Sequence, residues 1–139
     1  MHNVQCLFVD PMPGFQYLTE ARIELDQWPI AATYINNPID ALKHLHRLPT
    51  DELPEVILAD LRLPFFNGLE MAYRIHKSFG HTHPNMRFYL CVCPGQDLGR
   101  YGITDAPWVD GILHKPFDES CWRKLSGESR QVAAAASYY

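Results

Sequence analysis

The chain has 139 residues, the size of a single globular domain, and 47% of them are hydrophobic against 20% that are charged. Its formal net charge of −4 argues against direct nucleic-acid binding, which depends on cationic contacts with phosphate groups. No apolar run is long enough to span a membrane, and the first residues lack the basic start and apolar core of a signal peptide. The four cysteines are too few for a disulfide scaffold. We therefore expect a cytoplasmic protein with reduced thiols and no membrane contact.

Short apolar runs alternate along the chain with amphipathic stretches of helical length. The apolar runs predict strands, in chain order, at residues 4–9, 30–35, 56–59, 86–92 and 108–113. The amphipathic stretches predict helices at residues 14–25, 38–48, 68–79 and 118–125. Asn37 is predicted to cap the second of these helices, with Pro38 in its first turn.

Two stretches do not fit this alternation. Between residues 94 and 107 several glycines and prolines disfavour a regular helix, because each interior glycine costs about 1 kcal/mol. We expect a short, distorted helix or a loop there. The last residues are small and polar, so we expect a single domain over residues 1–127 and a flexible tail over residues 128–139.

Five strands that alternate with helices predict a parallel sheet with right-handed crossovers and helices on both faces. Ligands of such sheets bind at the carboxyl ends of the strands, near the switch in strand order. Asp10, Asp60 and Lys115 follow the first, third and fifth predicted strands, and Cys93 ends the fourth. We expect these four side chains to converge in one pocket.

The chemistry of these residue types allows two interpretations. Two neighbouring aspartates repel each other, and a divalent cation or a lysine relieves the repulsion. Asp60 beside Lys115 would stay ionised and could attack a phosphoryl group to form an acyl phosphate, with the lysine paired to a phosphoryl oxygen. The alternative is a structural salt bridge at the edge of the sheet. The residue types alone do not decide between the two.

Three motifs together resemble the receiver domain of two-component response regulators, over roughly residues 4–125. They are DLRLPFFNGLE, which begins at Asp60; GILHKPF, which contains Lys115 and Pro116; and VQCLFVD, which ends at Asp10. The resemblance implies a flavodoxin-like α/β fold, a doubly wound five-stranded parallel sheet of (βα)5 type. It implies that Asp60 accepts a phosphoryl group from a histidine kinase or a phosphotransfer protein, and that Lys115 contacts this group. It also implies a cis Lys115–Pro116 bond, and Mg²⁺ bound by Asp10, Asp60 and the backbone carbonyl of Arg62.

The sequence departs from the family pattern at three positions. Pro11 stands where a second acidic residue usually binds Mg²⁺ directly, so we expect weak Mg²⁺ binding. Cys93 stands at the usual Ser or Thr position, and a thiol is a weaker hydrogen-bond donor than a hydroxyl. Ile112 replaces the usual aromatic residue of the fifth strand.

Two functions remain open at this stage. The first is signalling by phosphotransfer to Asp60, with no enzymatic activity beyond self-catalysed phosphorylation and dephosphorylation. The second is a phosphorylation-independent pseudo-receiver that acts as a protein interaction module. In either case we expect a downstream protein target or an attached output domain as partner, and the resemblance leaves a homodimer open.

Overall fold

A computed structural model describes residues 3–96 and 107–126 of the chain, and the helices and strands below are those of these residues. None of the described helices has the length and apolar character needed to cross a membrane. The elements are, in chain order, β1 (Val4–Val9), α1 (Pro13–Asp26), β2 (Ile30–Ile35), α2 (Pro38–Arg47), the short 3₁₀ helix η1 (Thr50–Glu52), β3 (Val56–Asp60), α3 (Gly68–Phe79), β4 (Arg87–Val92), β5 (Gly111–His114) and α4 (Glu119–Ser126).

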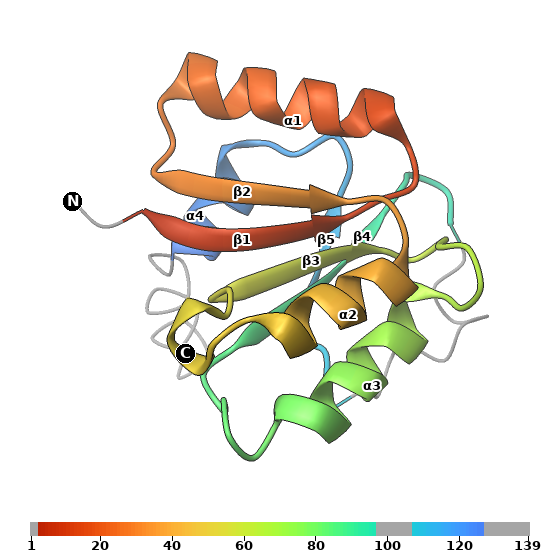
Figure 1. Ribbon diagram of the computed structural model, residues 1–139. Coiled ribbons are helices and arrows are strands. Elements are labelled where there is room, and N and C mark those ends of the chain that lie inside the picture. The colour runs from red at the N-terminus through yellow and green to blue at the C-terminus, as the bar shows by residue number, and fades with distance from the viewer. Residues whose placement is uncertain (1–2, 97–106, 127–139) are drawn as a thin grey trace, which may run out of the picture.

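The five strands form one parallel sheet in the order β2-β1-β3-β4-β5 (Figure 1). The strand order changes direction at β1, which pairs with β2 on one side and with β3 on the other. This is the doubly wound, flavodoxin-like arrangement that the sequence predicts. Most of the segment predicted as a distorted helix or loop, and the predicted tail, lie outside the described residues.

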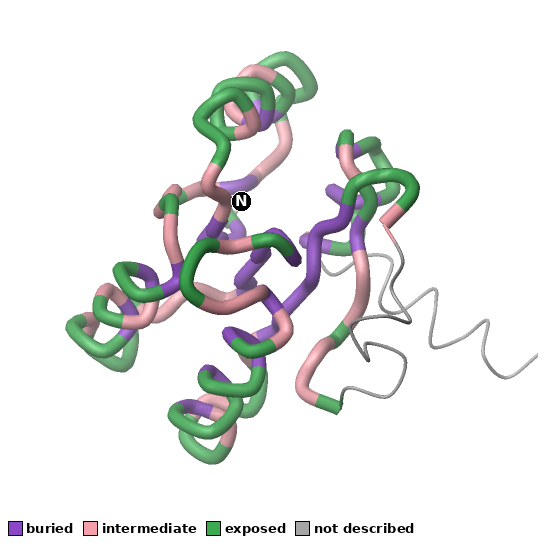
Figure 2. Tube along the Cα trace, turned by 90° about the vertical axis from the view of Figure 1, so that its right-hand side faces the viewer, coloured by how far each residue is buried: buried purple, intermediate pink, exposed green. Residues whose placement is uncertain are grey.

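Helices cover both faces of the sheet, with α1 and α4 on one face and α2 and α3 on the other (Figure 1). Alternate residues of each strand point to opposite faces. In β3, Ile57 and Ala59 therefore pack in the core beneath α2 and α3, whereas Val56 and Leu58 pack in the core shared with Trp122 of α4. Figure 2 shows buried residues at the centre and exposed residues on the outer faces of the helices. The central strands β3 and β4 are buried throughout, whereas β2 and β5 are mostly half-buried.

Side-chain hydrogen bonds cap the N-termini of two of the three helices α1, α2 and α3. The side chain of Asn37 accepts a hydrogen bond of 2.8 Å from the backbone N–H of Asp40, so the predicted cap of α2 is confirmed. The side chain of Asn67 caps α3 in the same way, through the backbone N–H of Glu70 at 2.8 Å. No side chain caps α1, which begins at Pro13.

The bounds of the fifth strand differ from the prediction, because the strand runs from Gly111 to His114 rather than over residues 108–113. Asp110 explains the late start. Its N–H donates to the carbonyl of Phe88 at 2.8 Å, and its carboxylate accepts the N–H of Phe88, also at 2.8 Å. A side chain thus completes the pairing that a backbone carbonyl would otherwise make, and regular strand pairing begins only with Gly111 opposite Tyr89.

The packing of α3 against β3 yields a first prediction. A Cβ atom on Gly68 would lie 2.5 Å from the carbonyl oxygen of Asp60 and 2.8 Å from Cδ2 of Leu90. We expect Gly68→Ala to lower the free energy of unfolding by about 1–3 kcal/mol, because neither backbone nor packed core can yield without strain. Gly14→Ala is the matched control, since a Cβ there meets no atom within 4 Å. Urea unfolding measures both, and equal stabilities would contradict the close approach.

Candidate functional site

Two acidic residues lie on either side of the point where the strand order changes. Asp10 directly follows β1, and Asp60 is the last residue of β3. The register pairs Val9 with Ala59, so the two aspartates leave the sheet at the same level. Lys115 follows β5, and its backbone N–H donates to the carbonyl of Val92 at 2.8 Å, which brings it to the same edge.

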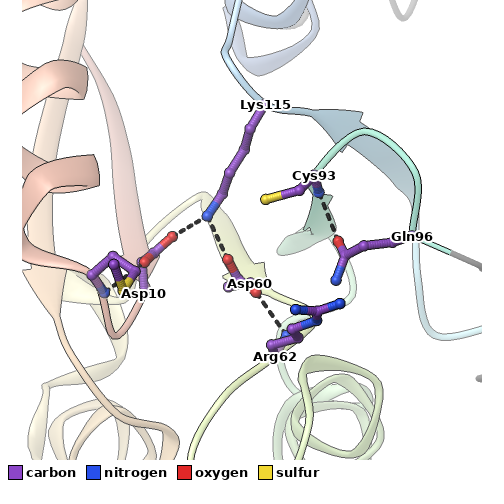
Figure 3. Close-up of polar contacts among 7 residues, drawn as sticks. Asp10, Asp60, Arg62, Cys93, Gln96 and Lys115 are labelled. Atoms are coloured by element: carbon purple, nitrogen blue, oxygen red, sulfur yellow. Dashed lines mark hydrogen bonds and ion pairs between the residues drawn. The ribbon is translucent and has the colours of Figure 1, made fainter.

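Lys115 joins the two aspartates directly. Its ammonium group donates hydrogen bonds to Oδ2 of Asp10 and to Oδ2 of Asp60 (Figure 3). The three side chains are largely buried, with exposed fractions of 12% for Lys115, 6% for Asp10 and 10% for Asp60. Nζ also lies 4.1 Å from the ring centroid of Phe15, the third residue of α1. Of the four side chains predicted to converge, Asp10, Asp60 and Lys115 therefore do so, and the fourth, Cys93, forms no hydrogen bond with them.

The cluster holds two acids and one base, and this imbalance governs its electrostatics. Burial alone would lower the pKa of Lys115, but its hydrogen bonds to Asp10 and Asp60 outweigh this and raise the pKa above 10.5. Burial raises the pKa of Asp10 above 3.8, against the hydrogen bonds from Lys115 and from the N–H of Met12. With both carboxylates ionised the cluster has one negative charge in excess, and it therefore favours binding of a proton or a further cation.

Backbone N–H groups hold the other oxygen of each carboxylate. Oδ1 of Asp10 accepts the N–H of Met12 at 2.8 Å, and Oδ1 of Asp60 accepts the N–H of Arg62 at 2.7 Å. The described residues contain no group of three or more His, Cys, Asp or Glu side chains that could hold a metal ion. Mg²⁺ needs fewer, because it binds through one or two carboxylates and otherwise keeps its waters. The two carboxylates and their excess charge therefore fit Mg²⁺.

Cys93 follows β4 and begins a tight turn. Gln96 closes this turn twice: its N–H donates to the carbonyl of Cys93 at 3.3 Å, and its Oε1 accepts the N–H of Cys93 at 2.6 Å. Pro94 and Gly95, with a φ of 85° at the glycine, are the residues that a type II turn favours at its centre. The thiol is free and lies on the exposed side of the site, with its sulfur directed toward Lys115 in Figure 3. It forms no hydrogen bond with the three charged residues, so the turn, and not the cluster, holds Cys93.

Two residues of the site did not emerge from the sequence. Phe15 places its ring beside the ammonium group, and Gln96 fixes the backbone of Cys93. The Pro-Gly pair before Gln96 indicates a turn, and so predicts the contact of Gln96 with Cys93 only in part. No local sequence signal indicates the contact of Phe15 with Lys115. The cis Lys115–Pro116 bond that the resemblance implied is confirmed.

Comparisons with known proteins extend the picture of the fold. No protein-family model matches the sequence, and a search of curated proteins gives no match. Solved structures do match. The receiver domain of a sensor histidine kinase from Pseudomonas aeruginosa PAO1, with a magnesium ion coordinated in its active-site cleft, is similar with a TM-score of 0.69. The identity is 19%, over 90% of this chain and 98% of that domain.

Two further solved structures give the same result. A two-component response regulator from Cytophaga hutchinsonii has a TM-score of 0.76 at 18% identity, over 92% of this chain and 97% of its own. A chemotaxis response regulator of Vibrio cholerae has a TM-score of 0.67 at 15% identity, over 94% of this chain and 98% of its own. The chain therefore has the fold of response-regulator receiver domains, with two carboxylates and a lysine at the carboxyl edge of its sheet.

Proposed function

We propose that the chain is a receiver domain in which Asp60 accepts a phosphoryl group from a histidine kinase or a phosphotransfer protein. One observation carries the proposal: Asp60 ends a fully buried strand, at the switch in strand order, and shares the ammonium group of Lys115 with Asp10. The backbone N–H of Arg62 orients this carboxylate, and the ammonium group of Lys115 lies within hydrogen-bond reach of it. The fold that the chain shares with receiver domains supports the proposal.

The proposed reaction transfers the phosphoryl group from a donor imidazole to Asp60. A carboxylate oxygen attacks phosphorus, so that an O–P bond forms while the N–P bond to the donor breaks, and the imidazole leaves with the bonding electron pair. The N–H of Arg62 orients the carboxylate, and Lys115 moves to pair with the transferred group, which adds a charge of about −1.5 to −2. Asp10, Asp60 and the backbone carbonyl of Arg62 would hold Mg²⁺, which supplies positive charge at the phosphoryl oxygens when bound.

A phosphorylation-independent interaction module is the second candidate, and two observations favour it. Pro11 directly follows Asp10 and offers no ligand oxygen on its side chain. Gln96 closes the turn at Cys93 with one backbone and one side-chain hydrogen bond, and Cys93 forms no hydrogen bond with the three charged residues. A site that binds Mg²⁺ weakly, and in which Gln96 instead of the cluster holds the end of β4, would serve as a scaffold for protein contacts.

Several finer features belong to the proposal. Activity is limited to the domain's own phosphorylation and dephosphorylation, without an external substrate. The partners are the phosphoryl donor and a downstream protein or an attached output domain, and a homodimer is compatible with the fold. The proposed location is the cytoplasm, without direct nucleic-acid or membrane binding. The boundaries of the receiver domain at residues 1–127 and of the tail at 128–139 remain predictions.

Phosphorylation of Asp60 tests the proposed function directly. Incubation with acetyl phosphate and Mg²⁺ should add one phosphoryl group to the wild type and none to Asp60→Asn, because the amide is not a nucleophile. Intact-mass spectrometry reads the result. Asp51→Asn, in the exposed stretch after α2, is the matched control and should be labelled like the wild type. Labelling that persists in Asp60→Asn would exclude Asp60 as acceptor, and an unlabelled wild type would favour the interaction module.

Mg²⁺ affinity gives a second test, centred on Pro11. We expect Pro11→Asp to bind Mg²⁺ about tenfold more tightly, a gain of about 1.4 kcal/mol, because it adds a charge and an oxygen ligand beside Asp10. Calorimetric titration measures both affinities. Pro54→Asp makes the same change just before the opposite end of β3 and should leave the affinity unchanged. If Pro11→Asp and the wild type bind alike, Pro11 does not occupy a ligand position.

The pH dependence of stability tests the bond between Lys115 and the two carboxylates. We expect Lys115→Met to lose about 3 kcal/mol near neutral pH, because two buried carboxylates remain without a cation. The folded state holds the lysine proton more tightly than the unfolded state. The contribution of protonated Lys115 to the stability of the fold is therefore complete below pH 10.5, its ordinary pKa. This contribution is lost as the pH rises through the higher pKa of the folded state.

Urea unfolding of the wild type and Lys115→Met at several pH values measures this difference. It should stay constant from about pH 7 to 9 and shrink above pH 10.5. Adding Asp10→Asn to Lys115→Met should restore part of the stability, since it removes the repulsion between the two acids. A difference that grows in alkali would contradict the assignment of Lys115 as the charge partner.

A further inference from the structure

A groove lies between α2 and α3, and none of its lining residues belongs to the Asp10, Asp60 and Lys115 cluster. It has a volume of about 370 Å³, and most of its lining is apolar. We call it the α2–α3 groove. Its apolar residues are Ile39, Leu42 and Phe66, and cationic side chains form its rim at Lys43, Arg47 and Arg74.

The rim concentrates positive charge on a chain whose formal net charge is −4. Arg74 lies with its guanidinium 4.4 Å from the ring centroid of Phe66 and pairs with Glu70 at 3.2 Å, in a half-exposed salt bridge. Lys43 and Arg47 are exposed and form no salt bridge with any of the described residues. The groove therefore offers two cations that have no salt-bridge partner among the described residues, next to an apolar surface.

Phe65, the neighbour of Phe66 in the chain, has an unusual conformation. Its φ is 73°, in the left-handed region that glycine and asparagine adopt easily and bulky side chains rarely do. Its side chain is nevertheless 77% exposed, so core packing does not explain the aromatic residue. Strain of this kind is typical of functional positions, and exposed aromatic residues are common anchors of protein interfaces.

We propose that the α2–α3 groove and Phe65 form a docking surface for an acidic segment of a partner protein that carries apolar side chains. Charge complementarity selects this occupant: acidic residues would face Lys43 and Arg47, and apolar residues would contact Phe65 and the groove. Another exposed apolar surface lies on α1, around Tyr17, Leu18 and Leu25. Its charges are mixed, because Arg22 pairs with Asp26 at 3.0 Å on the same helix. The docking surface goes beyond the proposed phosphotransfer and does not require a phosphoryl group on Asp60.

A synthetic probe tests the docking surface without knowledge of the natural partner. The probe is a fluorescein-labelled amphipathic peptide of glutamates and leucines, and its control has lysine in place of glutamate. We expect the acidic peptide to bind the full chain, with an affinity that falls as salt rises, and the basic peptide to bind much more weakly. Fluorescence anisotropy measures affinity, and amide NMR shifts should map binding to α2, α3 and the loop that holds Phe65.

Two variants separate the docking role from folding. Lys43→Glu with Arg47→Glu should weaken binding at least about tenfold, whereas Arg123→Glu, an exposed arginine on α4, should not. Phe65→Gly should also weaken binding, while its unfolding midpoint stays equal to that of the wild type or rises, because glycine relieves the backbone strain. Phosphorylation of Asp60 by acetyl phosphate should be unchanged in all three, so a failed phosphotransfer proposal leaves this test intact.

Several results would overturn the proposal. They are an acidic peptide that does not bind, equal binding of the two peptides, NMR shifts centred on α1, and Phe65→Gly binding like the wild type. Analytical sedimentation of the chain alone tests whether a second copy of the chain occupies the groove. Self-association that is lost in the Lys43→Glu, Arg47→Glu variant would show that a second copy of this chain, and not an acidic partner, occupies the groove.

Discussion

The ammonium group of Lys115 bonds two carboxylates that lie on either side of the switch in strand order, and the site depends on this contact. Asp10 and Asp60 leave the sheet at the same level because β1 and β3 are parallel neighbours. Two buried carboxylates at that spacing repel each other, and one lysine compensates only one of the charges. The fold thus creates a charge imbalance at one edge of the sheet. Binding of a proton or a cation would neutralise this excess charge, and a movement of Lys115 would redistribute it.

The rest of the structure makes this arrangement rigid. All five residues of β3 are buried, so the carboxylate of Asp60 is attached to a segment that packs on both faces. Gly68 brings the first turn of α3 against the carbonyl of Asp60, where a Cβ would lie 2.5 Å from its oxygen. On the opposite side, the ring of Phe15 covers the ammonium group. The carboxylate therefore has a fixed position before any ligand binds, as a phosphoacceptor or a protein-binding site requires.

The sequence predicts most of the fold because alternating apolar runs and helical stretches report burial directly. The convergence of Asp10, Asp60 and Lys115 also follows from sequence, since parallel strands bring their carboxyl ends to one edge. The features that the sequence does not predict depend on side chains that replace backbone hydrogen-bond partners or that meet across the fold. The carboxylate of Asp110 substitutes for a strand carbonyl and delays β5, and the ring of Phe15 reaches Lys115 from a distant helix. No local period encodes either contact.

The loop between β3 and α3 connects the two surfaces that we assign. It begins with the N–H of Arg62 on Oδ1 of Asp60, contains Phe65, and ends where the N–H of Gly68 donates to the carbonyl of Leu61 at 3.0 Å. Oδ1 of Asp60 has a second lone pair beside the one that accepts the N–H of Arg62, so a phosphoryl group or cation bound there would share this oxygen with the backbone of the loop. Charge placed on this oxygen would therefore act on a hydrogen bond of the loop that presents Phe65, whereas the end of β4 is held by Gln96. Two contacts of Asp60 lead toward the docking surface: the hydrogen bond with Arg62 at the start of the loop, and the close approach of Gly68 at the start of α3.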